Sequence, residues 1–398
     1  MIGEPAPLVV AHFKCADDKF HPDNNPDGKI NFGTAENHLM DEEMLRMVNQ
    51  PLSYSAKHLH YDLPHGAPTF RTAVAGFMEE NLEINDVNPD NIVVAGGASA
   101  ILESIAMSLF EDGEGLVVPT PYYSGFVHDF CTRFNVRILP YRLSPDNGYE
   151  LEIAGLKEVV EEARNEGIIV KAILMSSPQN PLGITYGDKK LEQIVEMARE
   201  YDLDIIADEM YAQSVYKGQF RSMLEIGWDY REHIHFVYGF AKDLVLSGFK
   251  TGILYSENRD LVSAVQEIAY FHPVSTQTQF FLENLISDRS WCREFAAINR
   301  AKLLESYTLT EKLLRERLGI KIIEANAGIF VWADFSDLLQ EQTFEAEMAL
   351  FQRIFNECDV NISPGQYFDS KTPGWFRICF AQKEEHMIEA AARLRKMM

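Results

Sequence analysis

The sequence has few of the features that would place a protein in a membrane or in an oxidising compartment. Its five cysteines are scattered and odd in number, with no pair at short spacing, so they indicate neither a disulfide framework nor a zinc site. No apolar run approaches the length needed to span a bilayer, and the opening residues lack a basic flank before a long apolar stretch. We therefore expect reduced thiols and a cytoplasmic protein without a membrane partner.

Positive charge is also scarce. Lysine and arginine number 36 against 60 aspartate and glutamate residues, which gives a formal net charge of -24 at pH 7. Such a field repels phosphate backbones and anionic lipids, so no nucleic acid is expected as a partner, although a local basic pocket can still bind a small anion. With 398 residues, 46% of them hydrophobic, the chain is long enough for one large and one smaller domain.

From about residue 91 to 256, short apolar runs alternate with amphipathic stretches. The runs begin near residues 91, 115, 136, 171, 203, 234 and 251, and helices are predicted between several of them, at 99–110, 156–167 and 189–202. Helices between strands favour a mainly parallel sheet that is covered on both faces. No helix is predicted between the last two runs, so an antiparallel edge strand is expected there.

After residue 273 the pattern changes to long helices mixed with short strands. A helical stretch covers 292–319, and strand candidates at 328–335 and 375–381 alternate with helices near 343–357 and 384–397. This mixture is typical of an α+β unit. We predict an α/β protein in which residues 1–50 contribute to a small domain, residues 51–272 form the large domain, and residues 273–398 form the remainder of the small one.

Polar side chains follow four of the predicted strands at their carboxyl ends, which is where ligands bind in an open α/β sheet. Taken singly, each has an ordinary explanation as a tight turn, a helix cap or an exposed side chain. Taken in order, they offer free helix N–H groups for a phosphate, an amide, an acid with a tyrosine three residues on, and an amine. They are Gly97, Ala98, Ser99, Asn180, Asp208, Tyr211, Lys242 and Lys250.

Pyridoxal 5′-phosphate (PLP) is a cofactor that needs this set of groups. Its aldehyde requires an amine, its pyridine nitrogen an acid, its ring oxygen O3′ a donor and its phosphate an anion cradle. The sequence therefore predicts a PLP enzyme. His58, His60 and His65 do not predict a metal site beside it, because no suitably placed cysteine or acid accompanies them.

The chain resembles the class I and II aminotransferases, and within them the 1-aminocyclopropane-1-carboxylate (ACC) synthase branch. The likeness extends from about residue 29 to 397. It rests on GTAENHL at 33–39, HGAPTFRTAVAGFM at 65–78, VPTPYYSGF at 118–126, and NISPGQYF with PGWFRICFA between 361 and 381. The resemblance implies a fold-type-I enzyme with PLP bound by the large domain, and a homodimer, because the active sites of the family lie between subunits.

The resemblance also assigns roles to residues by matching position. Lys242 is expected to form the Schiff base with PLP, and Asp208 to pair with the pyridine nitrogen. Arg377 is expected to receive the carboxylate of an amino-acid substrate as a bidentate pair. The other implied positions are Tyr211 and Asn180 at O3′, Tyr123 stacked on the ring, Glu36 near the substrate, and Gly97, Ala98, Ser99 and Lys250 around the phosphate.

Four departures from the family pattern concern the phosphate. Gly239 and Ala241 stand where the family has serines, and Lys250 stands where it has an arginine. Pro64 replaces a tyrosine that often comes from the neighbouring subunit and that borders the substrate in the ACC synthase branch. Losing these donors is expected to weaken the hold on the phosphate, at roughly 1–3 kcal/mol for each charged hydrogen bond removed.

Three functions are open on the sequence alone. The first is ACC-synthase-like elimination or γ-replacement on S-adenosylmethionine, in which Lys242 removes the α-proton, and the motifs favour it. The second is an aminotransferase that exchanges an amino group between an amino acid and a 2-oxo acid. The third is a non-catalytic family member, which the altered phosphate site favours and the retained set of Lys242, Asp208, Tyr211, Asn180 and Arg377 opposes.

Overall fold

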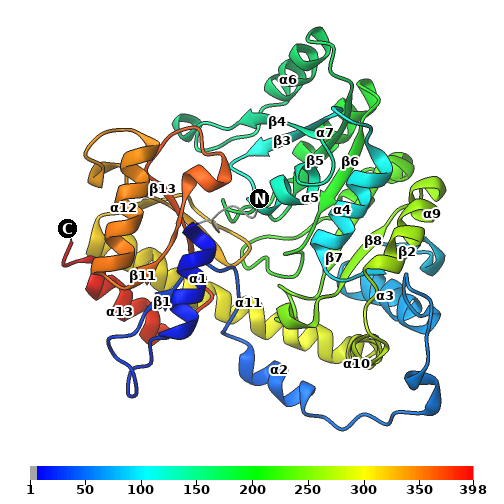
Figure 1. The fold of residues 1–398 in the computed structure, drawn as a ribbon, viewed down its shortest axis with the longest axis horizontal. Coiled ribbons are helices and arrows are strands. Elements are labelled where there is room, and N and C mark those ends of the chain that lie inside the picture. Colours follow the sequence, from blue (N-terminus) through cyan, green and yellow to red (C-terminus); the bar gives the residue numbers. More distant parts are fainter. Residues whose placement is uncertain (1–6, 398) are drawn as a thin grey trace.

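A seven-stranded sheet with helices on both faces forms the larger part of the molecule (Figure 1). The computed structural model describes residues 7–397. Residues 1–6 and 398, the outer ends of the predicted segments 1–50 and 273–398, lie outside the described residues. The strand order is β2, β8, β7, β6, β5, β3, β4. The strands are β2 (Ile92–Ala95), β3 (Gly115–Thr120), β4 (Arg137–Arg142), β5 (Val170–Ser176), β6 (Asp204–Asp208), β7 (Ile234–Gly239) and β8 (Gly252–Tyr255).

All strands of this sheet except β8 run in one direction, which confirms the predicted mainly parallel sheet. The predicted antiparallel strand is also present, but its predicted position at an edge is wrong. β8 lies between β2 and β7, and the edges are β2 and β4. Residues 240–251 contain only a short 3₁₀ turn, so β8 must return beside β7, and β2 then pairs with the free side of β8.

The strands bury alternate side chains in two separate cores. In β2, Ile92 and Val94 belong to one core and Val93 to the other, as the two-residue period of a strand requires. Helices α4 (Ala98–Leu109), α5 (Gly125–Cys131) and α9 (Arg259–Ile268) cover one face. Helices α3 (Pro68–Asn81), α6 (Ile153–Asn165), α7 (Asp188–Glu200), α8 (Met223–Ile226) and α10 (Thr276–Ser287) cover the other.

A smaller part of the molecule has its own sheet and core. Its four-stranded antiparallel sheet has the order β12 (Ser363–Pro364), β13 (Trp375–Cys379), β10 (Phe330–Asp334), β9 (Lys321–Ile322), and β1 (Ile30–Asn31) pairs in parallel with β11 (Val360–Asn361). Helices α1 (Pro7–Asp17), α12 (Phe344–Glu357) and α13 (Glu384–Leu394) contribute to the same core. The domain boundaries given above stay a prediction.

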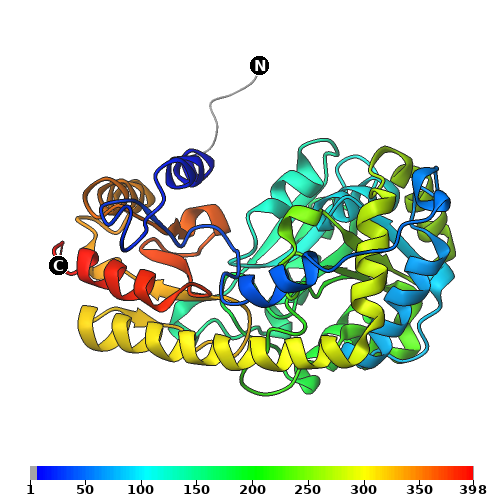
Figure 2. The same cartoon turned by 90° about the horizontal axis from the view of Figure 1, so that it is seen from below.

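Two connections join these parts. Helix α11 (Arg289–Lys312) runs along the molecule from α10 to the smaller sheet (Figure 2) and continues in a π-helical turn to Arg317. The irregular segment 32–38, called the strap below, leads from β1 to α2 (Asp41–Val48) and is fixed by hydrogen bonds to residues 361 and 381. Within residues 7–397, no helix has both the length and the apolar character needed to cross a membrane.

Candidate active site

A cavity of about 210 Å³ lies beyond the carboxyl ends of β5, β6 and β7, beside the first turn of α4. This is where an open α/β sheet binds its ligands. The structure therefore brings together residues that lie as far apart in the sequence as Ala35 and Thr251. The predicted residues in its wall are Gly97, Ala98, Ser99, Tyr123, Asn180, Asp208, Tyr211, Lys242 and Lys250.

Asp208 is the last residue of β6. Its Oδ2 accepts a hydrogen bond from the Ser176 hydroxyl at 2.8 Å, and its Oδ1 accepts one from the Met210 N–H at 3.3 Å. Burial raises the pKa of the Asp208 carboxyl to about 6, while the two hydrogen bonds and the charge of Lys242 act in the opposite direction. The carboxyl group is mostly ionised at neutral pH, and its orientation is fixed.

Lys242 lies in the turn that follows β7. Its Nζ donates a hydrogen bond of 2.7 Å to the carbonyl oxygen of Ala35 in the strap. Burial lowers the pKa of the Lys242 amine to about 8, and the nearby charge of Arg377 acts in the same direction. A substantial fraction of this amine is neutral near pH 8, as a nucleophile or a base requires.

Asn180 lies in the loop after β5 and points its amide toward the small sheet. The side chain of the preceding residue, Gln179, fixes this loop by donating to the carbonyl of Pro121 and accepting from the Leu182 N–H at 2.7 Å. Asn180 itself is 4% exposed, and its Oδ1 accepts a hydrogen bond from Arg377 at 3.1 Å. The loop therefore orients one amide between the cavity and Arg377.

Arg377 on β13 is outside the cavity wall but contacts it through Asn180. Its second terminal nitrogen donates to the carbonyl of Gly33 at 2.6 Å. The guanidinium carbon lies 4.9 Å from the centre of the Phe368 ring and 5.5 Å from that of Phe330. Among the residues that the structure describes, none accepts a hydrogen bond from the buried Nε, so this N–H is available to a bound carboxylate.

Two tyrosines complete the end of the cavity where Asp208 and Lys242 lie. Tyr211 is buried and packs edge-on against Phe330, with ring centres 5.2 Å apart. Burial raises the pKa of the Tyr211 phenol well above its usual value, so its hydroxyl stays a donor. Tyr123 packs edge-on against Phe126 at 5.5 Å, and burial of its phenol raises its pKa as well. Tyr123 is 36% exposed, which leaves part of its ring at the cavity surface.

The first turn of α4 presents the backbone N–H groups of Ala98 and Ser99 to the cavity. Gly97 caps this helix with φ of 109°, and no side chain caps it. Gly252 of β8 approaches so closely that a Cβ there would come within 2.5 Å of the Ala98 nitrogen. The uncapped first turn, with its partial positive charge, is suited to an anion such as a phosphate.

The four departures from the family pattern are distributed around this turn and beyond it. Lys250 and Ala241 are in the cavity wall, whereas Gly239 ends β7 behind it. A Cβ at Gly239 would come within 2.8 Å of the carbonyl oxygen of Thr251, which explains why the family's serine is not accommodated there. Pro64 is outside the wall and lines a separate cavity with neighbouring residues of the segment 58–64.

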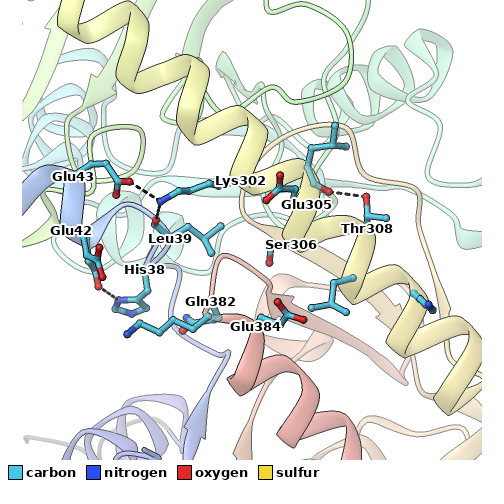
Figure 3. Close-up of a pocket in the computed structure, with 15 residues that line it drawn as sticks. His38, Leu39, Glu42, Glu43, Lys302, Glu305, Ser306, Thr308, Gln382 and Glu384 are labelled. Carbon is cyan, nitrogen blue, oxygen red and sulfur yellow. Dashed lines mark hydrogen bonds and ion pairs between the residues drawn. The ribbon is translucent and has the colours of Figure 1, made fainter. Parts of the chain in front are cut away.

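Glu36, like Arg377, is a predicted residue that lies outside the cavity wall. Its carboxylate lies 3.8 Å from Nε2 of His38, although its charge is close enough to raise the pKa of Lys242. His38 lines a second cavity of about 810 Å³ between α2, α11 and α13, where Lys302 binds the Leu39 carbonyl and Glu43 (Figure 3). The strap contributes Ala35 to the first cavity and His38 to the second, and Glu36 lines neither of them.

Some residues of the site were not predicted from the sequence. Ser176 orients Asp208, and its position at the end of a predicted strand could have revealed it. Phe330 and Phe368 flank Arg377 through contacts that no local pattern indicates. Asp129 of α5 is 8% exposed and lies in the cavity wall. Nothing in the sequence of this short helix says that its acid faces the cavity.

The residues of the cavity fit PLP. A lysine with a lowered pKa, an oriented carboxylate, a phenol and an amide surround one end of it, and an uncapped helix N-terminus with a close glycine backbone forms the other. Lys242, Asp208, Tyr211 and Asn180 would hold the ring. Residues 97–99 would hold the phosphate.

Comparisons with known proteins agree with the architecture. The sequence profile of the family described as aminotransferase class I and II matches residues 27–394. A 1-aminocyclopropane-1-carboxylate synthase of Nicotiana tabacum is 34% identical, with 100% of this chain and 84% of the relative covered. The 1-aminocyclopropane-1-carboxylate synthase 6 of Arabidopsis thaliana is 35% identical, with 94% of this chain and 78% of the relative covered.

Solved structures support the fold. Aspartate aminotransferase from Thermus thermophilus with maleate superposes with a TM-score of 0.83 at 20% identity, covering 99% of this chain and 97% of that one. Aspartate aminotransferase from Thermotoga maritima gives a TM-score of 0.76 at 23% identity, with 98% and 94% covered. The predicted α/β fold and the family resemblance are confirmed.

Proposed function

The chain belongs to the class I and II aminotransferase family and is a PLP-dependent enzyme, and from this premise we propose that it acts on S-adenosylmethionine as an ACC-synthase-like lyase. The observation that carries the proposal is the convergence of Lys242 and Asp208 on one cavity at the strand ends. The preference for this reaction over others rests on relatives named as ACC synthases, at 33–35% identity over 94–100% of the chain.

PLP, when bound, takes up the amino group of a substrate and withdraws the electron pair left at its Cα. The chain's own residues would prepare this chemistry. Asp208 would hold a proton on the pyridine nitrogen, because its ionised carboxylate has a fixed direction and a buried setting that strengthens the pairing. Tyr211 would donate its phenolic hydrogen to O3′, since the raised pKa keeps that hydrogen in place.

Lys242 would be the group that moves the proton. In the proposed reaction the Cα–H bond of the substrate breaks and its proton passes to Nζ of Lys242. A Cα–Cγ bond forms as the Cγ–S bond breaks, and the positively charged sulfur leaves as a neutral thioether, 5′-methylthioadenosine. The pKa of about 8 suits this role, because the amine is a strong enough base and is still partly neutral at physiological pH.

Arg377 would bind and orient the substrate through its α-carboxylate. A guanidinium binds a carboxylate with two parallel hydrogen bonds, and its direction here is supported by Asn180 and by two aromatic rings. The strap carbonyl of Gly33 holds the same guanidinium, so the substrate pocket adjoins the strap.

An aminotransferase is the second candidate. Pro64 favours it, because this position departs from the tyrosine of the ACC synthase pattern, whereas the lysine, acid and arginine suit both reactions. The two reactions differ in whether the substrate loses its sulfur substituent or its amino group.

The decisive experiment incubates the purified protein and PLP with S-adenosylmethionine, and in parallel with common amino acids and 2-oxoglutarate. We expect 5′-methylthioadenosine and ACC by mass spectrometry in the first reaction, and neither with Lys242→Ala. Glutamate in the second reaction, without 5′-methylthioadenosine in the first, would replace the lyase by the aminotransferase.

We also propose that the protein is a homodimer. Large apolar side chains are exposed on segments 54–63 and 270–271, including Leu59 at 79%, Tyr61 at 106%, Tyr270 at 69% and Phe271 at 75%. Such a patch is unusual on a monomer surface. It adjoins the turn before α4, because the backbone carbonyl of His272 accepts a hydrogen bond from the Gly96 N–H at 2.9 Å. Light scattering should give twice the mass of one chain. The double variant Tyr61→Asp, Phe271→Asp should have the mass of a single chain.

We further propose that the enzyme works in the cytoplasm. All five cysteines are unpaired, and four of them are buried in cores where they act as small apolar side chains. Fractionation of cells that produce the protein, with detection by antibody, tests this location.

A further inference from the structure

Asp129 is a buried acid for which the chemistry described above has no use. It lies on α5 in the wall of the PLP cavity and is 8% exposed. Its Oδ2 is buried and has no hydrogen-bond partner among residues 7–397, and no lysine, arginine or histidine of the described chain forms an ion pair with it. An ionised carboxylate would be costly in this position.

The surroundings of Asp129 are negative or neutral. Glu103 of α4 and Asp208 of β6 are the acids that face it, and both raise the pKa of its carboxyl, with burial as the largest cause, to about 7. The charge of Glu103 is already engaged by Arg133 at 2.8 Å and by His272 at 3.5 Å. The charge of Asp129 also raises the pKa of the Tyr123 phenol.

Ser99 is the polar neighbour of Asp129. Both residues line the cavity, and the Ser99 side chain is the one group that lowers the pKa of the Asp129 carboxyl. Ser99 belongs to the first turn of α4, where the phosphate would be held. If Asp129 is ionised, it accepts a hydrogen bond from the Ser99 hydroxyl. The Ser99 oxygen can then present only a lone pair to the phosphate. If Asp129 is protonated, it can donate to Ser99 Oγ, and the Ser99 hydrogen becomes available to the phosphate.

We propose that Asp129 is a positioning residue for the cofactor phosphate: in its protonated form it donates to Ser99 Oγ and directs the Ser99 hydroxyl hydrogen at the phosphate. This arrangement supplies a donor at the end of the cavity where Gly239 and Ala241 supply none. It also removes a negative charge that would repel the phosphate dianion. Cofactor binding then takes up one proton, whichever substrate the enzyme uses.

The test uses 4′-deoxypyridoxine 5′-phosphate, which lacks the aldehyde and so does not react with Lys242. Its dissociation constant is measured by fluorescence between pH 7 and 9, above the phosphate's own pKa of about 6. Unphosphorylated 4′-deoxypyridoxine is the matched ligand, because it carries the same ring and reports any titration of Asp208 or the pyridine nitrogen. The ratio of the two constants isolates the phosphate.

For the wild-type protein we expect this ratio to change by up to about tenfold per pH unit, with weaker phosphate binding at higher pH, as uptake of one proton requires. Asp129→Asn should bind as well as the wild type at pH 7 and show no pH dependence, since an amide N–H can donate to Ser99 permanently. Asp129→Leu should weaken binding by about tenfold. In a Ser99→Ala background, Asp129→Asn should have little further effect.

Two results would overturn the proposal. One is the same pH dependence in Asp129→Asn as in the wild type, because the proton would then bind elsewhere. The other is an equal pH dependence for the unphosphorylated ligand. Far-ultraviolet circular dichroism and thermal melting of each variant establish that the fold is intact, and Asp129→Asn, which keeps size and shape, carries the conclusion if Asp129→Leu does not fold.

Discussion

The two ends of the PLP cavity are built in different ways. At the ring end, Asp208 and Asn180 are each held by a side chain or backbone group at a defined distance, and Lys242 is held by the strap. At the phosphate end, the donors are backbone N–H groups of one helix turn, one hydroxyl and an exposed lysine. The chemistry therefore depends on individual side chains, whereas anchoring of the cofactor depends mainly on the course of the backbone.

This difference explains why departures from the family pattern are tolerated at one end. Backbone N–H groups at residues 97–99 do not change when a side chain is replaced, so lost hydroxyls reduce the affinity without changing the cradle. At the ring end, each group has a different chemical task, and no neighbour duplicates it. Substitutions at the two ends should separate into effects on turnover and effects on cofactor affinity.

The largest effect is expected at Lys242. Lys242→Ala removes the amine that bonds the cofactor and moves the proton, and turnover should fall by on the order of 10⁴-fold. The measurement is product formation at saturating PLP. Lys250→Ala is the matched control, because it removes a lysine from the wall of the same cavity and should mainly weaken PLP binding. Comparable losses of turnover in both variants would contradict the distinction between the two ends.

Arg377 should come next. Arg377→Lys keeps the charge but loses the forked geometry that binds a carboxylate and contacts Asn180, so kcat/KM should fall by about 10²-fold. Steady-state kinetics measure the loss, and PLP absorbance should show that the cofactor is still bound. An unchanged kcat/KM would mean that the substrate carboxylate binds elsewhere.

The pH dependence of PLP capture tests the lowered pKa of Lys242. Below the pKa of about 8 the amine is mostly an ammonium and cannot react, and above it the neutral amine predominates. At saturating PLP, the rate of covalent capture should rise by about 50-fold from pH 6 to pH 8 and then level off. Stopped-flow absorbance follows the reaction. A rise that continues with the same slope to pH 10 would indicate an ordinary exposed lysine.

The smallest effects are expected from restoring family residues at the phosphate end. Ala241→Ser adds a hydroxyl in the cavity wall, and it should tighten PLP by about fivefold with little change in turnover. Gly239→Ser is the matched comparison. Its Cβ would come within 2.8 Å of the Thr251 carbonyl, so we expect lower stability and no gain in affinity. Equal gains in both variants, measured by PLP titration, would refute this account of Gly239.

Much of the site could be predicted because strand ends are visible in the sequence. The apolar run 203–208 ends at Asp208, and the parallel sheet places that end beside the ends of β5 and β7. The position of β8 could not be predicted in the same way. The local pattern shows the direction of β8, but it does not show that β2 pairs with its other side. Glu36 was assigned by resemblance, and its orientation depends on His38, a contact within an irregular segment.

Contacts between distant elements were beyond the sequence for a physical reason. Asp129 faces the cavity because α5 packs at one particular rotation against α4, and a seven-residue helix has too short a pattern to specify that rotation. The same holds for the rings of Phe330 and Phe368, which flank Arg377 only after β10 and the 365–368 turn have formed around β13.

Helix α11 has a mechanical consequence. Its 24 residues form a rod about 36 Å long, whose first turns bury Phe295 in the core of the larger part and whose later turns bury Leu303 and Tyr307 in the core of the smaller one. Neither core can come apart without exposing one half of the same rod. Heat should therefore melt both halves in a single calorimetric transition, and a helix-breaking proline midway along the rod should split that peak into two.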